Sequence, residues 1–86
     1  MNIDFCYVAY SREEIFIKEF GKHIAGIRKS KKLTQEDLAF KSELEYSQIS
    51  RIERGVINTS ISQVYKIAKA LDVPVSELFV FNKKTQ

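Results

Sequence analysis

Apolar residues recur at helical spacing along most of the chain. In the first such stretch they follow one another at intervals of four, four and three residues: Phe16, Phe20, Ile24 and Ile27. This spacing is typical of one buried face of an α-helix. Ser11 and Glu14 are spaced as a capping box at its start. The pattern therefore predicts a helix from residue 12 to about residue 30.

Two shorter helices are predicted between residues 33 and 55. Thr34 and Asp37 are spaced as a capping box, which begins a helix over residues 35–42. A second helix, over residues 46–54, ends at Gly55, a residue suited to a left-handed C-terminal cap. One apolar seam runs along both helices: Leu38, Ala39, Leu44, Ile49 and Ile52. Because the small side chain of Ala39 lets the helices cross closely, the segment is predicted to be a helix-turn-helix unit.

Two further helices follow. Ser60 and Gln63 are spaced as a third capping box, before a helix that extends to residue 71. Five of its residues are expected to face inward: Ile61, Val64, Ile67, Ala68 and Leu71. Pro74 suits a helix start, which predicts a last short helix over residues 75–79. We therefore expect an all-α fold: a compact five-helix domain over residues 11–81 with a central helix-turn-helix, then a flexible tail over residues 82–86.

Residues 1–10 have a different pattern. Apolar and polar residues alternate here, with the apolar positions at Ile3, Phe5, Tyr7 and Ala9. Such alternation is typical of a short strand or an extended arm. A lone strand has no partner within a helical chain, so it would pair across a dimer, pack as an arm or stay loose. The sequence leaves these three alternatives open.

Composition limits the class of protein. Eighty-six residues with 44% hydrophobic content suffice for one compact domain, and we expect no separate sensing or catalytic domain. The single cysteine, Cys6, excludes an internal disulfide and fits a reducing compartment. No apolar run approaches the ~20 residues of a membrane span, and no signal-peptide pattern is present. We therefore expect a cytoplasmic protein that does not bind membranes.

The inventory of reactive side chains argues against catalysis. His23 is the only histidine, and no second cysteine or histidine offers the spacing of metal ligands. The three glycines form no phosphate-cradling loop. Glu36 and Asp37 are adjacent acids, but they lie in a first helical turn, where the helix dipole favours them. We expect no enzyme activity, no metal and no cofactor.

Basic residues are concentrated before the helix-turn-helix unit. The net charge of the chain is only +3, yet residues 22–32 hold five basic side chains and no acid: Lys22, Arg28, Lys29, Lys31 and Lys32. Residues 34–60 carry three basic and five acidic side chains, a net charge of −2. Attraction to phosphate would therefore depend on the end of the first helix, on helix N-termini and on selected arginines. The alternative explanation of the basic cluster is a solvated helix end.

Five segments resemble, in order and spacing, the phage-repressor/Cro-like helix-turn-helix regulators. They are Gly21-x-x-Ile24-x-x-Ile27-Arg28, Leu33-Thr34-Gln35-Glu36-x-Leu38-Ala39, residues 49–55, residues 67–71 and residues 76–79. The resemblance covers about residues 20–79. Three residues depart from the family pattern. Lys32 and Glu43 stand where the family has glycine, and Ser42 is polar where the family is often apolar.

The resemblance implies sequence-specific binding of double-stranded DNA, as a small bacterial or phage-type transcriptional regulator. It places four residues at base edges in the major groove: Tyr46, Ser47, Ser50 and Arg51. Phosphate contacts are expected from Gln35, Arg54, Asn58 and Thr59. Arg51 is best able to bind guanine through O6 and N7. The family also pairs an arginine with a glutamate across two helices, here Arg28 with Glu53.

A single reading helix covers only a few base pairs, so we expect a homodimer on a palindromic operator. The expected dimer surface is the apolar end of the chain: Val73, Val75, Leu78, Phe79 and Phe81. Leu78 and Phe79 alternatively close the monomer core. Two rival functions stay open. One is a restriction-modification controller or antitoxin that also binds a protein partner, and the other is a helical protein-interaction adaptor that does not touch DNA.

Overall fold

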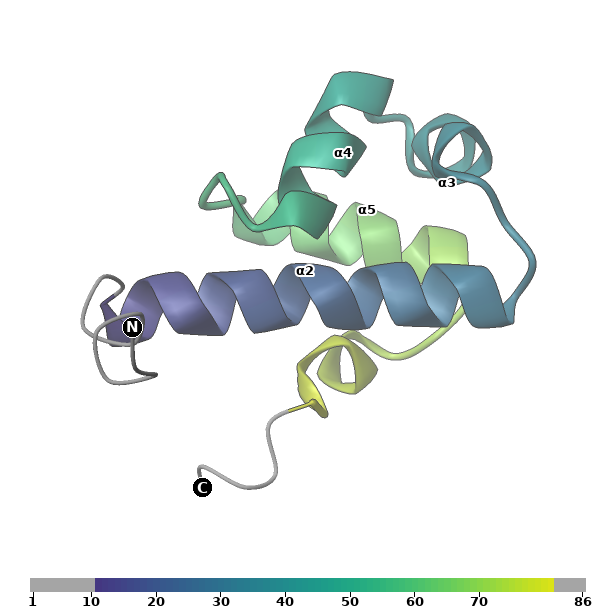
Figure 1. Ribbon diagram of the computed structural model, residues 1–86. Helices are drawn as coiled ribbons and strands as arrows, with labels where there is room; N and C mark the ends of the chain where they lie inside the picture. Colours follow the sequence, from purple (N-terminus) through teal and green to yellow (C-terminus); the bar gives the residue numbers. More distant parts are fainter. Residues whose placement is uncertain (1–10, 82–86) are drawn as a thin grey trace.

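The computed structural model describes residues 11–81, which form four α-helices and one 3-10 helix (Figure 1). They are α2 (Arg12–Ser30), α3 (Gln35–Ser42), α4 (Tyr46–Arg54), α5 (Ile61–Leu71) and the 3-10 helix η1 (Val75–Phe79). The expected all-helical fold is confirmed, but the last predicted helix is a 3-10 helix, a geometry common in such short segments. The predicted arm at residues 1–10 and the tail at residues 82–86 lie outside the described residues.

The helix starts form where the capping residues predict them. Both halves of the box are present at α2 and α3; in α3, Thr34 Oγ1 accepts from the Asp37 N–H at 3.0 Å, and the Asp37 carboxylate accepts from the Thr34 N–H at 2.9 Å. At α5 only one of the two hydrogen bonds of the capping box is present. Ser60 Oγ accepts from the Gln63 N–H, but the Gln63 side chain accepts from the Thr59 hydroxyl instead of returning to Ser60.

All three departures from the family pattern fit the local backbone. Lys32 and Glu43 both have φ of 61°, the left-handed conformation that glycine adopts most easily. A larger residue in this conformation costs about 1 kcal/mol but leaves the turn unchanged. Ser42 is buried, and its hydroxyl donates to the Leu38 carbonyl at 2.6 Å, so its polar group is satisfied within α3.

Helix α2 runs through the middle of the domain, with α3, α4 and α5 on one side and η1 on the other (Figure 1). The buried core contains Phe20, Ile24, Leu38, Ala39, Ile49, Ile52, Val64, Ile67, Ala68, Leu71 and Leu78. The seam predicted along α3 and α4 is therefore buried, with Leu44 partly covered at its edge. Within residues 11–81, no helix is both long and apolar enough to cross a bilayer.

Two residues expected to face the core are exposed. Ile61 was predicted to point inward but is 86% exposed, because it is the first residue of α5 and lies beyond the helices that cover the later turns. Phe16 is 47% exposed and packs at the edge of the domain, where its ring lies 5.3 Å from that of Phe81. Helical spacing predicted which face of each helix is buried, but not at which residue the packing of the neighbouring helices ends.

Helices α2 and α4 approach each other closely at Gly21. A Cβ atom at this position would lie 2.7 Å from the carbonyl oxygen of Glu53 and nearer still to that of Ile52. The absence of a side chain at Gly21 therefore allows α2 and α4 to pack closely. Gly26 has no such role, since a Cβ atom there would meet nothing within 4 Å.

Candidate nucleic-acid interface

Helices α3 and α4, joined by residues 43–45, form the helix-turn-helix unit. Ile49 and Ile52, which are 1% and 2% exposed, fix one face of α4 against the domain. Of the residues predicted to contact bases, Tyr46, Ser47 and Arg51 are exposed and Ser50 is half-buried. At the start of α4 the Gln48 side chain accepts from the Glu45 N–H at 3.2 Å, and the Gln48 N–H donates to the Glu45 carbonyl at 3.0 Å.

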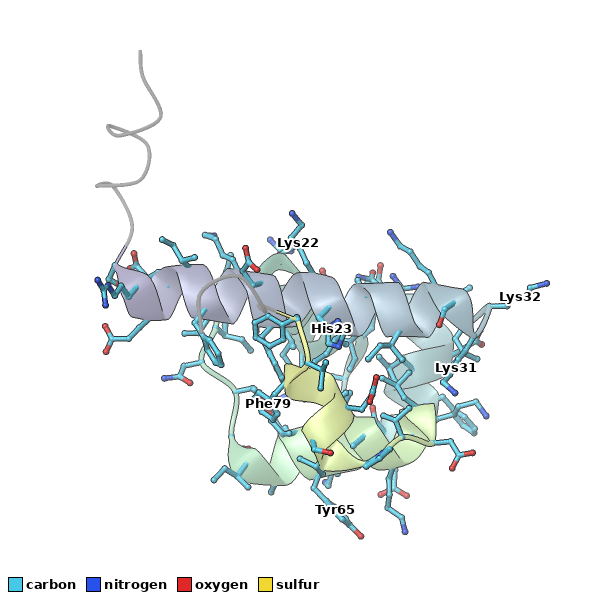
Figure 2. All side chains as sticks on the ribbon, turned by 90° about the horizontal axis from the view of Figure 1, so that it is seen from below. Lys22, His23, Lys31, Lys32, Tyr65 and Phe79 are labelled. Carbon is cyan, nitrogen blue, oxygen red and sulfur yellow. The ribbon has the colours of Figure 1, made fainter. Side chains whose placement is uncertain are left out.

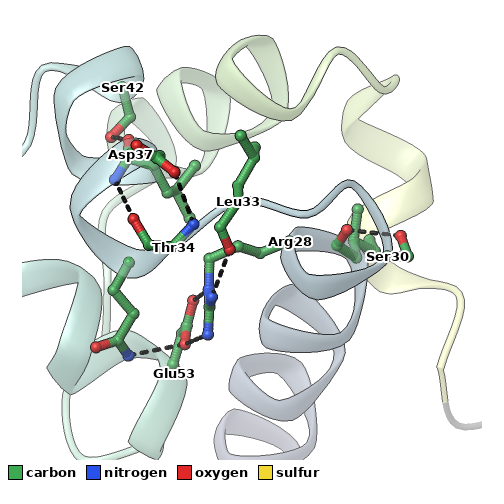
Figure 3. Close-up of polar contacts among 10 residues, drawn as sticks. Arg28, Ser30, Leu33, Thr34, Asp37, Ser42 and Glu53 are labelled. Carbon is green, nitrogen blue, oxygen red and sulfur yellow. Dashed lines mark hydrogen bonds and ion pairs between the residues drawn. The ribbon is translucent and has the colours of Figure 1, made fainter.

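A buried ion pair connects α2 to this reading helix (Figure 3). Arg28 Nε donates to Glu53 Oε2 at 2.7 Å and Arg28 Nη2 donates to Glu53 Oε1 at 3.0 Å. Arg28 Nη1 also donates to the Leu33 carbonyl at 2.7 Å, which ties the pair to the turn before α3. The hydrogen bonds to Glu53 raise the pKa of Arg28 above its ordinary value. The structure thus contains the pair that the family resemblance implied.

Gln35 joins this pair. Its Nε2 atom donates to Glu53 Oε1 at 2.9 Å, so one carboxylate holds side chains from both α2 and α3. Gln35 is the first residue of α3, and its backbone N–H therefore has no partner within the helix. Gln35 is predicted to contact phosphate. Glu53 uses one N–H of the Gln35 side-chain amide, which leaves the other amide N–H and the backbone N–H for that predicted contact.

The arginines of α4 differ in their contacts. Arg54 Nε donates to Ser50 Oγ at 3.3 Å, which places a predicted phosphate contact beside a predicted base contact. The side chain of Arg51 is exposed and makes no hydrogen bond or ion pair within the part of the chain that the structure describes. Its guanidinium is therefore available to a ligand on the exposed face of α4.

The loop after α4 carries the other two predicted phosphate contacts. Gly55, with φ of 71°, ends α4 and turns the chain into this loop. Asn58 is exposed, whereas Thr59 is half-buried and uses its hydroxyl to bond Gln63. Asn58 and Thr59 also line an apolar pocket of about 170 Å³ between α2, α5 and η1, which includes Phe16, Ile61 and Phe79.

The basic cluster is not one patch. Arg28 is buried in the ion pair. In Figure 2, Lys22 lies midway along α2, whereas Lys31 and Lys32 lie beyond its C-terminal end. Only these last two lysines immediately precede α3, so the cluster contributes less charge beside the reading unit than its sequence suggests.

The residues expected at a dimer surface have different environments. Leu78 is fully buried and belongs to the monomer core, which is the alternative that the sequence left open for it. Val75 and Phe79 are 41% and 42% exposed, whereas Val73 and Phe81 are half-buried. Leu78 is therefore removed from the predicted surface, because its side chain has no area left for a second subunit.

A family model described as Helix-turn-helix matches residues 24–78, more than half of the chain. The chain belongs to the helix-turn-helix family. The match spans the second half of α2 through η1 and so includes the ion pair and the reading helix. The expected membership is confirmed, and the protein is a DNA-binding helix-turn-helix transcriptional regulator.

Regulators of two kinds are similar to this chain. Control protein C.BamHI of Bacillus amyloliquefaciens is 44% identical over 63 residues, which are 72% of this chain and 78% of that protein. The immunity repressor protein of Bacillus phage phi105 is 43% identical over 67% of this chain, but the chain spans only 40% of that repressor. The crystal structure of the restriction-modification controller protein C.AhdI from Aeromonas hydrophila has a TM-score of 0.72 and 41% identity, covering 73% of this chain and 96% of the controller.

Proposed function

We propose that this regulator recognises its DNA site through the exposed face of α4, with Arg51 specifying a base. The observation that carries the proposal is the position of Arg51, exposed opposite Ile49 and Ile52 and without an intramolecular partner in residues 11–81. A guanidinium that is not used by the fold keeps its donors for guanine O6 and N7. Tyr46, Ser47 and Ser50 of the same helix are assigned to further base contacts.

Contacts to the phosphate backbone would position this helix. The backbone N–H of Gln35 at the start of α3 is suited to a phosphate oxygen. Arg54, Asn58 and Thr59 are the other phosphate contacts in the proposal. They lie at the end of α4 and in the loop that follows it, so the contacts would flank the reading helix at both sides.

The regulator would act as a homodimer, through the face formed by Phe16, Ile61 and Phe79. These three exposed apolar residues line one pocket. Because Asn58 and Thr59 line the same pocket, this face begins beside the loop assigned to DNA. Two copies that meet here would present both reading helices on one side, as a two-fold operator requires. Val73, Val75 and Phe81, which the sequence assigns to the dimer interface, stay predicted interface residues.

The biological role that the relatives favour is control of restriction-modification genes by a cytoplasmic regulator. The similarity to C.AhdI extends over 96% of that controller, whereas only 40% of the phage repressor is matched. An antitoxin, which would need a surface for its toxin, has no comparable support.

Selection of bound sites from a random duplex pool, followed by affinity measurements on the selected site, tests the DNA-reading role. Arg51→Ala should cost about 1–3 kcal/mol on that site and relax the preference at one position. Arg54→Ala, the matched control, should weaken all sequences evenly. If Arg51→Ala lowers affinity equally for every sequence, its assignment to a base is wrong. Binding that is insensitive to both salt and Arg51 would favour the adaptor alternative.

A further inference from the structure

A groove of about 440 Å³ lies between the C-terminal end of α3 and the outer side of α5. Its lining includes three lysines, one acid and two apolar surfaces: Lys41, Lys66, Lys69, Glu43, Tyr65 and Ala70. Figure 2 shows Tyr65 projecting from α5 on the side away from α2. None of the residues assigned to DNA or to the dimer face lines this groove. It is therefore a third surface, separate from both.

The groove is positively charged. Three lysines against one glutamate give a net charge of +2. None of the three lysines forms an ion pair with another residue of the described range. Lys69 instead places its ammonium 5.9 Å from the centre of the Tyr65 ring. Ammonium groups that share one concave surface repel each other, so an anionic partner would be stabilised there.

The groove also has apolar surface. Tyr65 is 55% exposed, and Ala70 is half-buried beside it. The methylene stems of the lysines add to this surface, with their ammonium groups at the water-exposed end. A peptide with acidic and apolar side chains can match both the lysines and this apolar floor. Lysine, unlike arginine, also has no planar fork for bidentate phosphate recognition.

We propose that this groove binds a carboxylate-rich segment of a partner protein, with apolar side chains of that segment on Tyr65 and Ala70. The partner's acids would lie against Lys41, Lys66 and Lys69. Because the groove shares no residue with the DNA-reading face, the partner binds while the regulator occupies its operator. A dimer of the proposed kind would carry two such grooves to each operator.

A fluorescein-labelled peptide of alternating glutamate and leucine, followed by anisotropy, tests the proposal on the full chain. The double variant Lys66→Gln/Lys69→Gln should weaken binding of this peptide by about tenfold, the size expected for two exposed charge pairs. Lys22→Gln/Lys29→Gln is the matched control, since it removes the same charge from exposed positions on α2, and it should change binding by less than about twofold. A peptide with glutamine in place of glutamate should bind more weakly than the acidic one.

Three results would overturn the proposal. Equal losses of peptide affinity in the two double variants would mean that binding depends only on the overall charge of the protein. An unmeasurable affinity of the wild-type protein for the acidic peptide would remove the site. A loss of duplex DNA affinity in Lys66→Gln/Lys69→Gln, as large as the loss of peptide affinity, would show that the groove binds phosphate. DNA affinity measured on the same variants keeps a failure of this proposal distinct from a failure of DNA reading.

Discussion

The two halves of α2 are covered by different kinds of contact. The half from Gly21 to Arg28 holds the reading helix, through close backbone approach at Gly21 and two hydrogen bonds from Arg28 to Glu53. In residues 11–81, every buried side-chain nitrogen or oxygen has a hydrogen-bond partner. The other half carries Phe16, whose ring stacks on Phe79 at 6.4 Å while both side chains stay more than 40% exposed.

This difference separates contacts that are complete within the monomer from apolar surface that is left for a second subunit. A junction whose polar groups are all paired gains nothing from a further partner, and breaking it strands a charge. A half-covered aromatic face, in contrast, gains free energy when another apolar surface removes it from water. The C-terminal half of α2 therefore sets the shape of the reading unit, and the N-terminal half is the part available to a second copy.

The largest effect on folding is expected where the ion pair is broken. Arg28→Ala and Glu53→Ala should each lower the free energy of unfolding by about 3–5 kcal/mol, because each leaves the other charge buried and unpaired. The double variant should lose much less than the sum. Urea unfolding of the three variants measures this. Strictly additive losses, or a native melting temperature in Arg28→Ala together with weak DNA binding, would instead make Arg28 a phosphate contact.

Gly21→Ala should cost about 3 kcal/mol, because the added methyl group meets two backbone carbonyl oxygens of α4 that cannot move independently. Gly26→Ala on the same helix is the control. With nothing within 4 Å of its Cβ, it should stabilise the domain by about 0.5–1 kcal/mol. Thermal unfolding compares the two. Equal effects of the two substitutions would mean that α2 and α4 do not pack as closely as the structure has them.

A smaller, pH-dependent effect is expected at the start of α3. The hydrogen bond from the Thr34 N–H, with that from the Thr34 hydroxyl, lowers the pKa of Asp37 below its ordinary value. The carboxylate therefore contributes stability above its unfolded pKa of about 4, and this contribution is lost as the pH falls through the lower folded value. Asp37→Asn should lower the melting temperature near neutral pH, and the gap to wild type should close in acid. A gap that is constant from about pH 7 to about pH 2 would contradict this assignment.

The smallest effect on folding, under about 0.5 kcal/mol, is expected for Ile61→Glu, because its side chain is 86% exposed. Its effect should appear in association instead. A charge in the centre of the proposed dimer face should shift the protein to monomer in sedimentation velocity. Phe40→Glu, at another apolar residue that is 86% exposed but outside this face, is the control and should leave the dimer intact. A wild-type protein that is monomeric both free and on its operator would remove the dimer proposal.

The sequence by itself determined the helices and the unit they form. The predicted bounds 35–42 and 46–54 agree with α3 and α4. Caps and apolar spacing act between residues within one or two turns, so they can be recognised without the fold. The turn at Glu43 is also set by local sequence, since this residue adopts the left-handed conformation although it is not the glycine of the family. The predictions of the reading face of α4 and of the pairing of Arg28 with Glu53 came from the family resemblance. A known family implies a known packing of the helices, which spacing alone does not give.

The tertiary structure alone decided which side chains those helices cover. Gln35 and Glu53 are 18 residues apart, and nothing in the spacing indicates that the amide meets the carboxylate. Periodicity predicted that Ile61 faces inward, and the sequence left Leu78 between a dimer surface and the monomer core. Ile61 is in fact 86% exposed, and Leu78 is fully buried. The groove that joins Lys41 to α5 likewise depends on how α3 packs against α5. Helical spacing fixes the direction of a side chain around its own axis, whereas burial depends on where the neighbouring helices begin and end.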